Sequence, residues 1–206
     1  MKNATTLYLV RHGQTEWNTQ HRMQGRKDSP LTPLGVRQAE QLGEALRDVC
    51  FDIVCTSSSG RARHTAQLVR GHQVADIVVY DELQEIDMGH WEGLTQEEIK
   101  ASEPERLEQF WKEPDLFEGR TGESFHDAKQ RALACLNGIV DAYPGKTILI
   151  VTHSATLKLL MAHWEGRPMR DLWEPPFLQP ASLCKVALRD GRPEIILYGD
   201  VRHDER

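Results

Sequence analysis

The stretch TILIV at residues 147–151 is β-branched and wholly apolar, which is typical of a strand buried in the middle of a parallel sheet. Residues 6–10, TLYLV, form a second stretch of the same kind. Each stretch runs almost directly into a histidine: His153 follows the first after one threonine, and His12 follows the second after one arginine. We therefore expect two central parallel strands whose carboxyl ends carry these two histidines.

Strand-like and helix-like segments alternate outward from these two strands. A helix is expected to begin at Thr32 and Pro33, because threonine caps helices and proline suits the first helical position. Further strands are predicted at residues 51–55 and 77–80, further helices at 60–70, 95–111, 124–142 and 156–164, and a closing hairpin at 182–188 and 194–198. This alternation predicts an α/β fold, a three-layer α/β/α sandwich with a small helical lid. We expect a single domain over residues 1–206, with the lid inserted at about 94–123.

A cationic crevice that contains imidazole groups is expected where the strands end, because active sites of open α/β sheets lie at the carboxyl ends of strands. Arg11 directly precedes His12, and the predicted helix at 60–70 brings Arg61 to the same edge within its first turn. Guanidinium groups and helix N-termini suit the oxygens of a dianionic phosphoryl group. A neutral imidazole is a competent nucleophile toward phosphorus. The residues therefore predict phosphoryl transfer through a phosphorylated histidine, with His12 as the nucleophile.

Composition narrows the classes of partner. The 206 residues carry a net charge of −6, which disfavours nucleic acid or a membrane surface as partner because both select a basic face. No apolar run approaches the roughly 20 residues that span a bilayer, and residues 1–10 lack the features of a signal peptide. The four cysteines form no CxxC pair and are expected to be reduced thiols of a cytoplasmic protein. No metal-ligand spacing is evident, so we expect neither a metal nor a cofactor.

Several motifs carry a family resemblance. Residues 11–18, RHGQTEWN, resemble the RHGxTxWN signature of the histidine phosphatase superfamily, which includes the cofactor-dependent phosphoglycerate mutases. Similar segments follow in the family's order: D-x-P-L-T-x-x-G at residues 28–35, S-x-L-x-R-A-x-x-T-A at 57–66 with Ser59 in place of the usual Leu, L-x-E-x-x-x-G-x-W-E-G at 83–93, and G-E-S at 122–124. The chain looks most similar to the broad-specificity phosphatases of Bacillus-type bacteria.

This resemblance implies a role for each matching residue. His12 would be the phosphorylated nucleophile, and Glu85, expected to be shielded near Trp91, would protonate the leaving oxygen and then activate water. The phosphoryl oxygens would be held by Arg11, Arg61, His153, Asn18, Gln24 and the backbone N–H of Ser154. Ser154 departs from the family pattern, which usually has glycine there. The departure matters only if glycine is needed for a positive φ.

The aromatic segment of the lid has two interpretations. Phe110, Trp111, Leu116 and Phe117 are most simply read as core beneath the lid. The alternative is an apolar wall beside the leaving group, which would favour aromatic or otherwise non-polar phosphate esters. Residues 175–177, Pro-Pro-Phe, would then belong to the same rim.

The resulting first hypothesis is a metal-independent phosphomonoester hydrolase of fairly broad specificity, acting on small-molecule phosphate monoesters. The main alternative is a cofactor-dependent phosphoglycerate mutase, an isomerase that uses the same phosphohistidine. Such mutases usually close the site with longer insertions than this short chain offers. A dedicated metabolic phosphatase, such as α-ribazole phosphatase or phosphoserine phosphatase, is a variant of the first hypothesis. A phosphate-recognising protein without turnover is a third class, and the sequence leaves a homodimer open.

Overall fold

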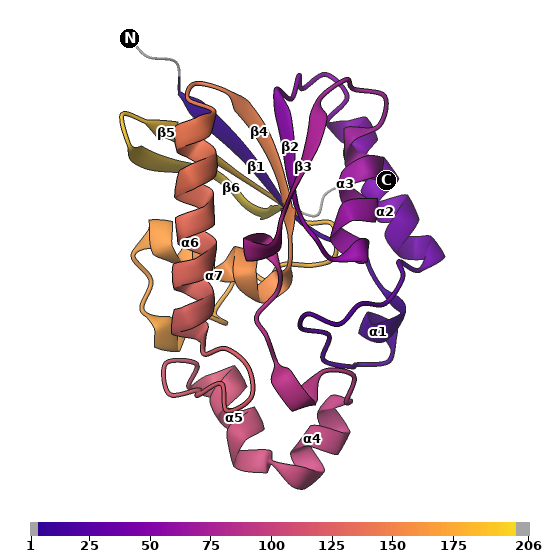
Figure 1. Ribbon diagram of the computed structural model, residues 1–206, viewed down its shortest axis with the longest axis vertical. Coiled ribbons are helices and arrows are strands. Elements are labelled where there is room, and N and C mark those ends of the chain that lie inside the picture. Colours follow the sequence, from indigo (N-terminus) through magenta and orange to yellow (C-terminus); the bar gives the residue numbers. More distant parts are fainter. Residues whose placement is uncertain (1–3, 201–206) are drawn as a thin grey trace.

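A computed structural model describes residues 4–200, and its centre is one six-stranded sheet (Figure 1). The strands are β1 (Thr5–Arg11), β2 (Ile53–Ser57), β3 (Asp76–Tyr80), β4 (Thr147–Thr152), β5 (Leu183–Arg189) and β6 (Arg192–Asp200). Their order is β3-β2-β4-β1-β5-β6, with β1 to β4 parallel. β5 pairs antiparallel with β1, and β6 pairs antiparallel with β5, which confirms the closing hairpin. The expected domain bounds of 1–206 include residues 1–3 and 201–206, which lie outside the described part.

The central pair of strands is the one that the two apolar stretches predict. β1 and β4 are parallel neighbours, and Arg11 lies opposite Thr152 in their register. His12 and His153 each follow one of these paired residues. Both histidines therefore leave the sheet at the same carboxyl edge, as expected from the parallel arrangement.

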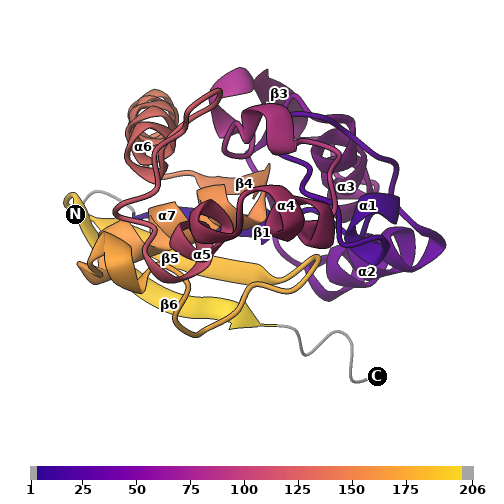
Figure 2. The same cartoon turned by 90° about the horizontal axis from the view of Figure 1, so that it is seen from below.

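Helices cover both faces of the sheet, which gives the three-layer sandwich (Figures 1 and 2). The helices are α1 (Glu16–Thr19), α2 (Pro33–Ala45), α3 (Gly60–Arg70), α4 (Gln96–Ser102), α5 (Pro104–Lys112), α6 (Phe125–Ala142) and α7 (Ser154–Glu165), with 3₁₀ turns η1 (Asp81–Leu83), η2 (Gly89–Trp91) and η3 (Met169–Asp171). Leu7 and Leu9 of β1 pack in the cluster that holds α6 and α7, whereas Tyr8 and Val10 pack with α2 and α3. This alternation follows from the two-residue period of a strand. Among residues 4–200, every helix is too short or too polar to cross a bilayer.

Most element boundaries lie within two residues of the predicted ones, and three differences bear on the site or on the helical extension. β2 occupies residues 53–57 and not 51–55, so that its end reaches Ser57 at the carboxyl edge. α7 begins at Ser154, two residues earlier than predicted. The predicted helix over 95–111 is two helices, α4 and α5, because Pro104 disfavours the α conformation in Glu103 before it, and Glu103 has φ −137° and ψ 59°.

α4 and α5 form the small helical extension of the fold beyond the carboxyl edge of the sheet (Figure 1). Phe110 and Phe117 are buried in a third hydrophobic cluster with Phe125 of α6, as the core interpretation expected. Leu116, in contrast, is 58% exposed, and its assignment to the core is wrong. Trp111 is 39% exposed and lies at the boundary between core and solvent.

Candidate active site

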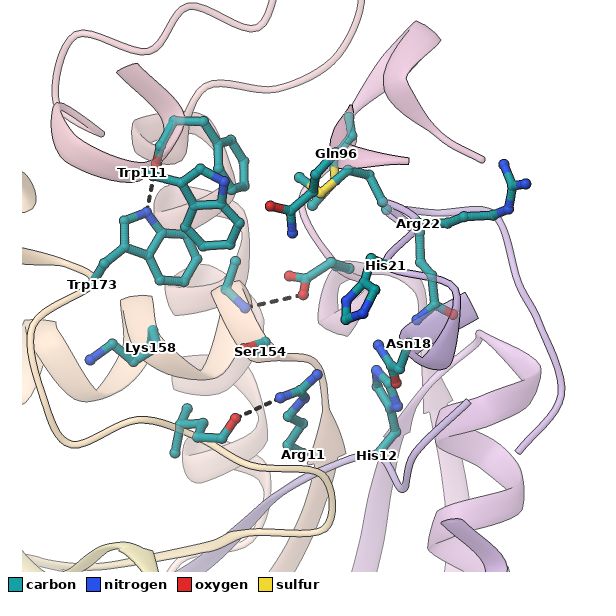
Figure 3. A pocket seen from close by; sticks show the side chains of 18 of the residues that line it. Arg11, His12, Asn18, His21, Arg22, Gln96, Trp111, Ser154, Lys158 and Trp173 are labelled. Carbon is teal, nitrogen blue, oxygen red and sulfur yellow. Dashed lines mark hydrogen bonds between the residues drawn. The ribbon is translucent and has the colours of Figure 1, made fainter. Parts of the chain in front are cut away.

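A pocket of about 310 Å³ opens at the carboxyl edge of the sheet, beneath the α4–α5 extension (Figure 3). Segments far apart in the sequence line it, from the end of β1, the start of α3, the loop after η1 and the start of α7. Most of the expected site residues belong to this lining: Arg11, His12, Asn18, Gln24, Arg61, Glu85 and Ser154. His153 is not part of this lining; it is fully buried and packs against His12.

His12 presents one defined nitrogen to the pocket. Its Nδ1 lies 2.8 Å from the carbonyl oxygen of Gly13. A carbonyl can only accept, so Nδ1 carries the hydrogen and Nε2 keeps its lone pair in the neutral ring. The pKa of His12 lies well below its ordinary value, because burial penalises the charged ring and the neighbouring Arg61 and Arg11 add to that penalty. At neutral pH the ring is therefore uncharged and nucleophilic.

His153 packs edge-on against His12, with 5.2 Å between the ring centroids. Its Nε2 lies 2.8 Å from the hydroxyl oxygen of Ser57, at the end of β2. Its Nδ1 is buried and has no hydrogen-bond partner within residues 4–200. Burial lowers the pKa of His153 well below its ordinary value, and the charges of Arg61, His12 and Arg11 lower it further. The structure thus places a second neutral imidazole beside the first.

Arg61 is held almost rigidly in the first turn of α3, where it is 1% exposed. Its Nη1 donates to the carbonyl of Lys27 at 2.7 Å and to Oδ1 of Asp28 at 2.8 Å, and its Nη2 donates to the carbonyl of Gly25 at 2.7 Å. Burial lowers the pKa of Arg61, while the Asp28 carboxylate opposes that change. The D-x-P-L-T segment thereby supplies the carboxylate that orients this guanidinium group.

Arg11 is the second guanidinium group of the pocket, and its side chain is partly buried. Its Nη1 donates to the carbonyl of Leu178 at 2.6 Å. Burial lowers the pKa of Arg11 to about 10, partly offset by the charge of Glu85. The Nε atoms of Arg11 and Arg61 are both buried without a hydrogen-bond partner among the described residues. Because a buried N–H is costly when unpaired, these atoms mark a site suited to an anionic ligand.

The carboxylate of Glu85 sits on the N-terminus of α7. Its Oε1 accepts from the backbone N–H groups of Ile86 and Thr156, each at 3.0 Å, and lies 3.1 Å from the Thr156 hydroxyl. Its Oε2 accepts from the N–H of Ala155 at 3.1 Å. Oε2 therefore has more capacity left for a proton than Oε1. Apart from Ile86, the partners that hold Glu85 come from α7, whereas the indole N–H of Trp91, the expected shield, donates to Glu103 at 3.0 Å.

Two amide side chains present donors to the pocket. Oδ1 of Asn18 accepts from the backbone N–H of Thr15 at 3.0 Å, which closes the capping box of α1. Oε1 of Gln24 accepts from the hydroxyl of Ser29 at 3.2 Å. In each amide the oxygen is engaged and the NH₂ group remains to donate. Both side chains line the pocket, so both can reach an anion bound there.

Ser154 occupies its position without strain. The non-glycine residues with positive φ in the described chain are His21, Ala181 and Asp190, so Ser154 does not need the conformational freedom of glycine. The Glu85 carboxylate accepts hydrogen bonds from the backbone N–H groups of Ala155 and Thr156. The N–H group of Ser154, also in the first turn of α7, is not used by Glu85. The departure from the family pattern at this position therefore leaves the backbone donor in place.

Several pocket residues were missed or left undecided by the sequence. Trp111 and Trp173 line the pocket together, with ring centroids 5.0 Å apart (Figure 3). Phe177 is also part of the lining, so Trp111 and Phe177 lie where the second interpretation places an apolar wall. Lys158 also lines the pocket, and its spacing of four residues from Ser154 on α7 could have predicted a shared helix face. His21 also belongs to the lining, whereas His90 instead bonds Glu103 and Thr121.

Comparison with known proteins gives consistent matches. The model of the family described as "Histidine phosphatase superfamily (branch 1)" matches residues 7–201. The "Uncharacterized phosphatase PhoE" of Bacillus subtilis (strain 168) is 35% identical over 162 residues, which cover 79% of this chain and 78% of that protein. The "Probable phosphoglycerate mutase GpmB" of Cronobacter sakazakii is 36% identical over 169 residues, covering 79% and 75%. The solved structure of Bacillus stearothermophilus YhfR superposes with a TM-score of 0.95 at 44% identity, covering 97% of this chain and 99% of that one.

Proposed function

The chain belongs to the histidine phosphatase superfamily, and we propose that it is a phosphomonoester hydrolase of fairly broad specificity that works through a phosphohistidine at His12. The observation that carries this proposal is the state of His12: its Nδ1 bonds the carbonyl of Gly13, which leaves the lone pair on Nε2, and burial together with the neighbouring charges of Arg61 and Arg11 lowers its pKa. Such a group attacks phosphorus while the fixed cations stabilise the charge on the phosphoryl oxygens.

The first step transfers the phosphoryl group to the enzyme. The lone pair of His12 Nε2 forms a bond to phosphorus as the bond from phosphorus to the ester oxygen breaks. The electron pair of the broken bond goes to that oxygen, which takes a proton from Oε2 of Glu85. Arg11, Arg61 and the amides of Asn18 and Gln24 hold the phosphoryl oxygens in the expected roles. The alcohol then leaves through the aromatic rim.

The second step returns the enzyme to its starting state. Water enters, and Glu85, now a carboxylate, takes one of its protons as the water oxygen bonds to phosphorus. The bond from phosphorus to nitrogen breaks, and its electron pair returns to Nε2 of His12. The net reaction consumes one ester and one water and releases one alcohol and one phosphate. His153, which packs against His12, and the backbone N–H of Ser154 keep their expected role in this scheme, which is to hold the phosphoryl oxygens.

The rim favours hydrolysis of esters with apolar or aromatic leaving groups. Trp111, Trp173 and Phe177 line the pocket, and Trp111 is 39% and Phe177 63% exposed. Such a wall binds many apolar groups by contact and does not select one by directed hydrogen bonds. The exposed rim also lets water reach the phosphohistidine, which supports a hydrolase over a mutase that must retain the intermediate. Cytoplasmic location, oligomeric state and the one-domain bounds stay predictions.

A direct assay separates the candidate functions. The protein is incubated with p-nitrophenyl phosphate and with 3-phosphoglycerate, in EDTA, with and without 2,3-bisphosphoglycerate. We expect phosphate release that resists EDTA. Interconversion of phosphoglycerates that depends on the bisphosphate would favour the mutase, and activity abolished by EDTA would contradict the metal-independent scheme. Among residues 4–200, no group of three or more His, Cys, Asp or Glu side chains could hold a metal ion.

The nucleophile is tested by trapping. Rapid quenching at alkaline pH, followed by mass measurement of tryptic peptides, should find one phosphoryl group on the peptide that contains His12. His12→Asn should abolish both the adduct and turnover, because asparagine can donate to Gly13 but cannot attack phosphorus. His126→Asn, on the exposed face of α6, is the matched control and should keep both. Turnover that survives His12→Asn would overturn the assignment.

A further inference from the structure

Residues 174–178, here called the strap, run between η3 and β5 along the pocket rim. Phe177 of the strap lines the pocket and is 63% exposed, whereas the next residue, Leu178, is 5% exposed and packs into the core. The strap thus places one aromatic ring in the leaving-group wall and anchors it through its neighbour. The position of Phe177 consequently depends on what holds the strap main chain.

Cationic side chains from other parts of the chain hold the strap by its carbonyl groups. Nζ of Lys158, on α7, donates to the carbonyl of Glu174 at 2.5 Å and lies 3.2 Å from that of Pro176. Arg167, just after α7, donates to the carbonyls of Glu174 at 2.8 Å and Pro175 at 2.9 Å. Hydrogen bonds from charged donors are stronger than neutral ones, so these contacts define the strap's path.

The strap is also joined to the phosphate side of the pocket. Arg11, which the proposed mechanism places on the phosphoryl group, donates from Nη1 to the carbonyl of Leu178 at 2.6 Å. The same short segment therefore contacts a phosphate-binding side chain at one end and supplies the rim ring Phe177 beside it. A shift of the strap would move the leaving-group wall relative to the phosphate site.

Lys158 is an unusual residue for the wall of a pocket, because it is only 2% exposed. Burial and the charge of Arg167 lower its pKa to about 8. In Figure 3 its side chain extends from α7 away from His12, and its ammonium group also lies 5.5 Å from the ring centre of Tyr198. Two of its three N–H groups face strap carbonyls, so its geometry suits main-chain support better than contact with the phosphoryl group.

We propose that Lys158 is a positioning residue that sets the enzyme's selectivity for aromatic over small polar phosphate esters by holding the strap so that Phe177 completes the leaving-group wall. This inference rests on the proposed phosphatase function. Lys158 acts through Phe177 and does not touch the reacting atoms. Its removal changes the choice of substrate more than the chemistry of the phosphohistidine.

The measured quantity is a selectivity ratio, the kcat/KM for p-nitrophenyl phosphate divided by the kcat/KM for glycerol 2-phosphate. Lys158→Met keeps the length of the side chain but cannot donate hydrogen bonds. We expect it to lower the ratio about tenfold, the size expected when a buried donor pair is lost. Most of the change should appear in KM for the aromatic ester. Lys185→Met, a lysine on β5 outside the pocket lining, is the matched control and should leave the ratio unchanged.

A double variant tests the path from Lys158 to Phe177. Phe177→Ala alone should also lower the ratio, because it removes the ring from the wall. If Lys158 acts through that ring, adding Lys158→Met to Phe177→Ala lowers the ratio no further. Arg167→Met, which removes the bonds of Arg167 to the strap carbonyls of Glu174 and Pro175, should lower the ratio in the same direction. It supplies the test if Lys158→Met fails to fold.

The outcomes are distinguishable. A folded Lys158→Met protein with the wild-type ratio would overturn the inference, and so would effects of Lys158→Met and Phe177→Ala that simply multiply. A ratio that falls equally for Lys185→Met would point to a non-specific loss of charge and would also overturn it. If the wild-type protein hydrolyses neither ester, the proposed function itself has failed, which is a separate result.

Discussion

The imidazole rings of His12 and His153 lie 5.2 Å apart, centroid to centroid, with an angle of 61° between their planes. They follow the ends of β1 and β4, which are parallel neighbours with Arg11 opposite Thr152. Burial, together with nearby cations, lowers the pKa of each ring. The sheet thus brings together two neutral imidazoles that the chain places far apart, and it does so where two arginines supply the positive charge.

Stability should depend on pH through these buried rings. The unfolded chain protonates histidine near pH 6.5, whereas folded His12 stays neutral to lower pH, so acid favours the unfolded state. The free energy of unfolding should fall as pH drops below about 6.5, by at most about 1.4 kcal/mol per pH unit for each such ring. Urea unfolding at pH 7.5, 6.5 and 5.5 measures this. His12→Asn should show a shallower loss over that range, and an identical slope would contradict the buried, neutral assignment.

Asp28 should matter to catalysis although it does not line the pocket that contains His12. Its Oδ1 bonds Nη1 of Arg61 at 2.8 Å, and Asp28→Asn would weaken this charged contact of the guanidinium group. We expect kcat/KM to fall by roughly 10- to 100-fold, the cost of misplacing a group that positions the substrate. Steady-state kinetics with p-nitrophenyl phosphate measures it. Asp52→Asn is the control, because Asp52 pairs with Lys146 away from the pocket, and an equal loss there would refute the specific role.

Replacing Glu85 should separate the two chemical steps. Glu85→Gln removes the proton donor and acceptor, and we expect kcat to fall by about 10²- to 10⁴-fold. p-Nitrophenolate leaves without much need of an acid, so the second step should slow more than the first with this ester. The variant should then release a burst of p-nitrophenol and accumulate phosphohistidine. A pH profile and burst amplitude unchanged from wild type would remove Glu85 from the mechanism.

The α4–α5 extension should be anchored mainly by Phe110. Its ring lies within 6.0 Å, centroid to centroid, of Trp91, Trp173 and Phe125, and it is 1% exposed. Phe110→Ala should destabilise the protein by about 3–5 kcal/mol, because it leaves a cavity in this cluster. Leu116→Ala, at an exposed position on the same segment, should change stability by less than about 0.5 kcal/mol. Equal losses of unfolding free energy for the two variants would show that the cluster does not anchor the extension.

Local patterns were sufficient for the order of the elements and for part of the site. The apolar stretches at 6–10 and 147–151 predicted β1 and β4, and Thr32 caps α2 as expected. The wrong predictions also came from local patterns. The pattern over 95–111 predicted one helix, but Pro104 divides this segment into α4 and α5. Periodicity reports which face is buried and is weaker at marking where an element stops.

The sequence by itself determined that two histidines follow two central strands, and which motifs bring arginine, glutamate and amide side chains toward them. Only the tertiary structure decided that His153 is buried against His12, that α7 holds Glu85, and that Lys158 bonds the strap. The reason is physical. Strand and helix patterns arise from interactions between residues close in the chain, whereas these contacts join segments that meet only when the layers pack.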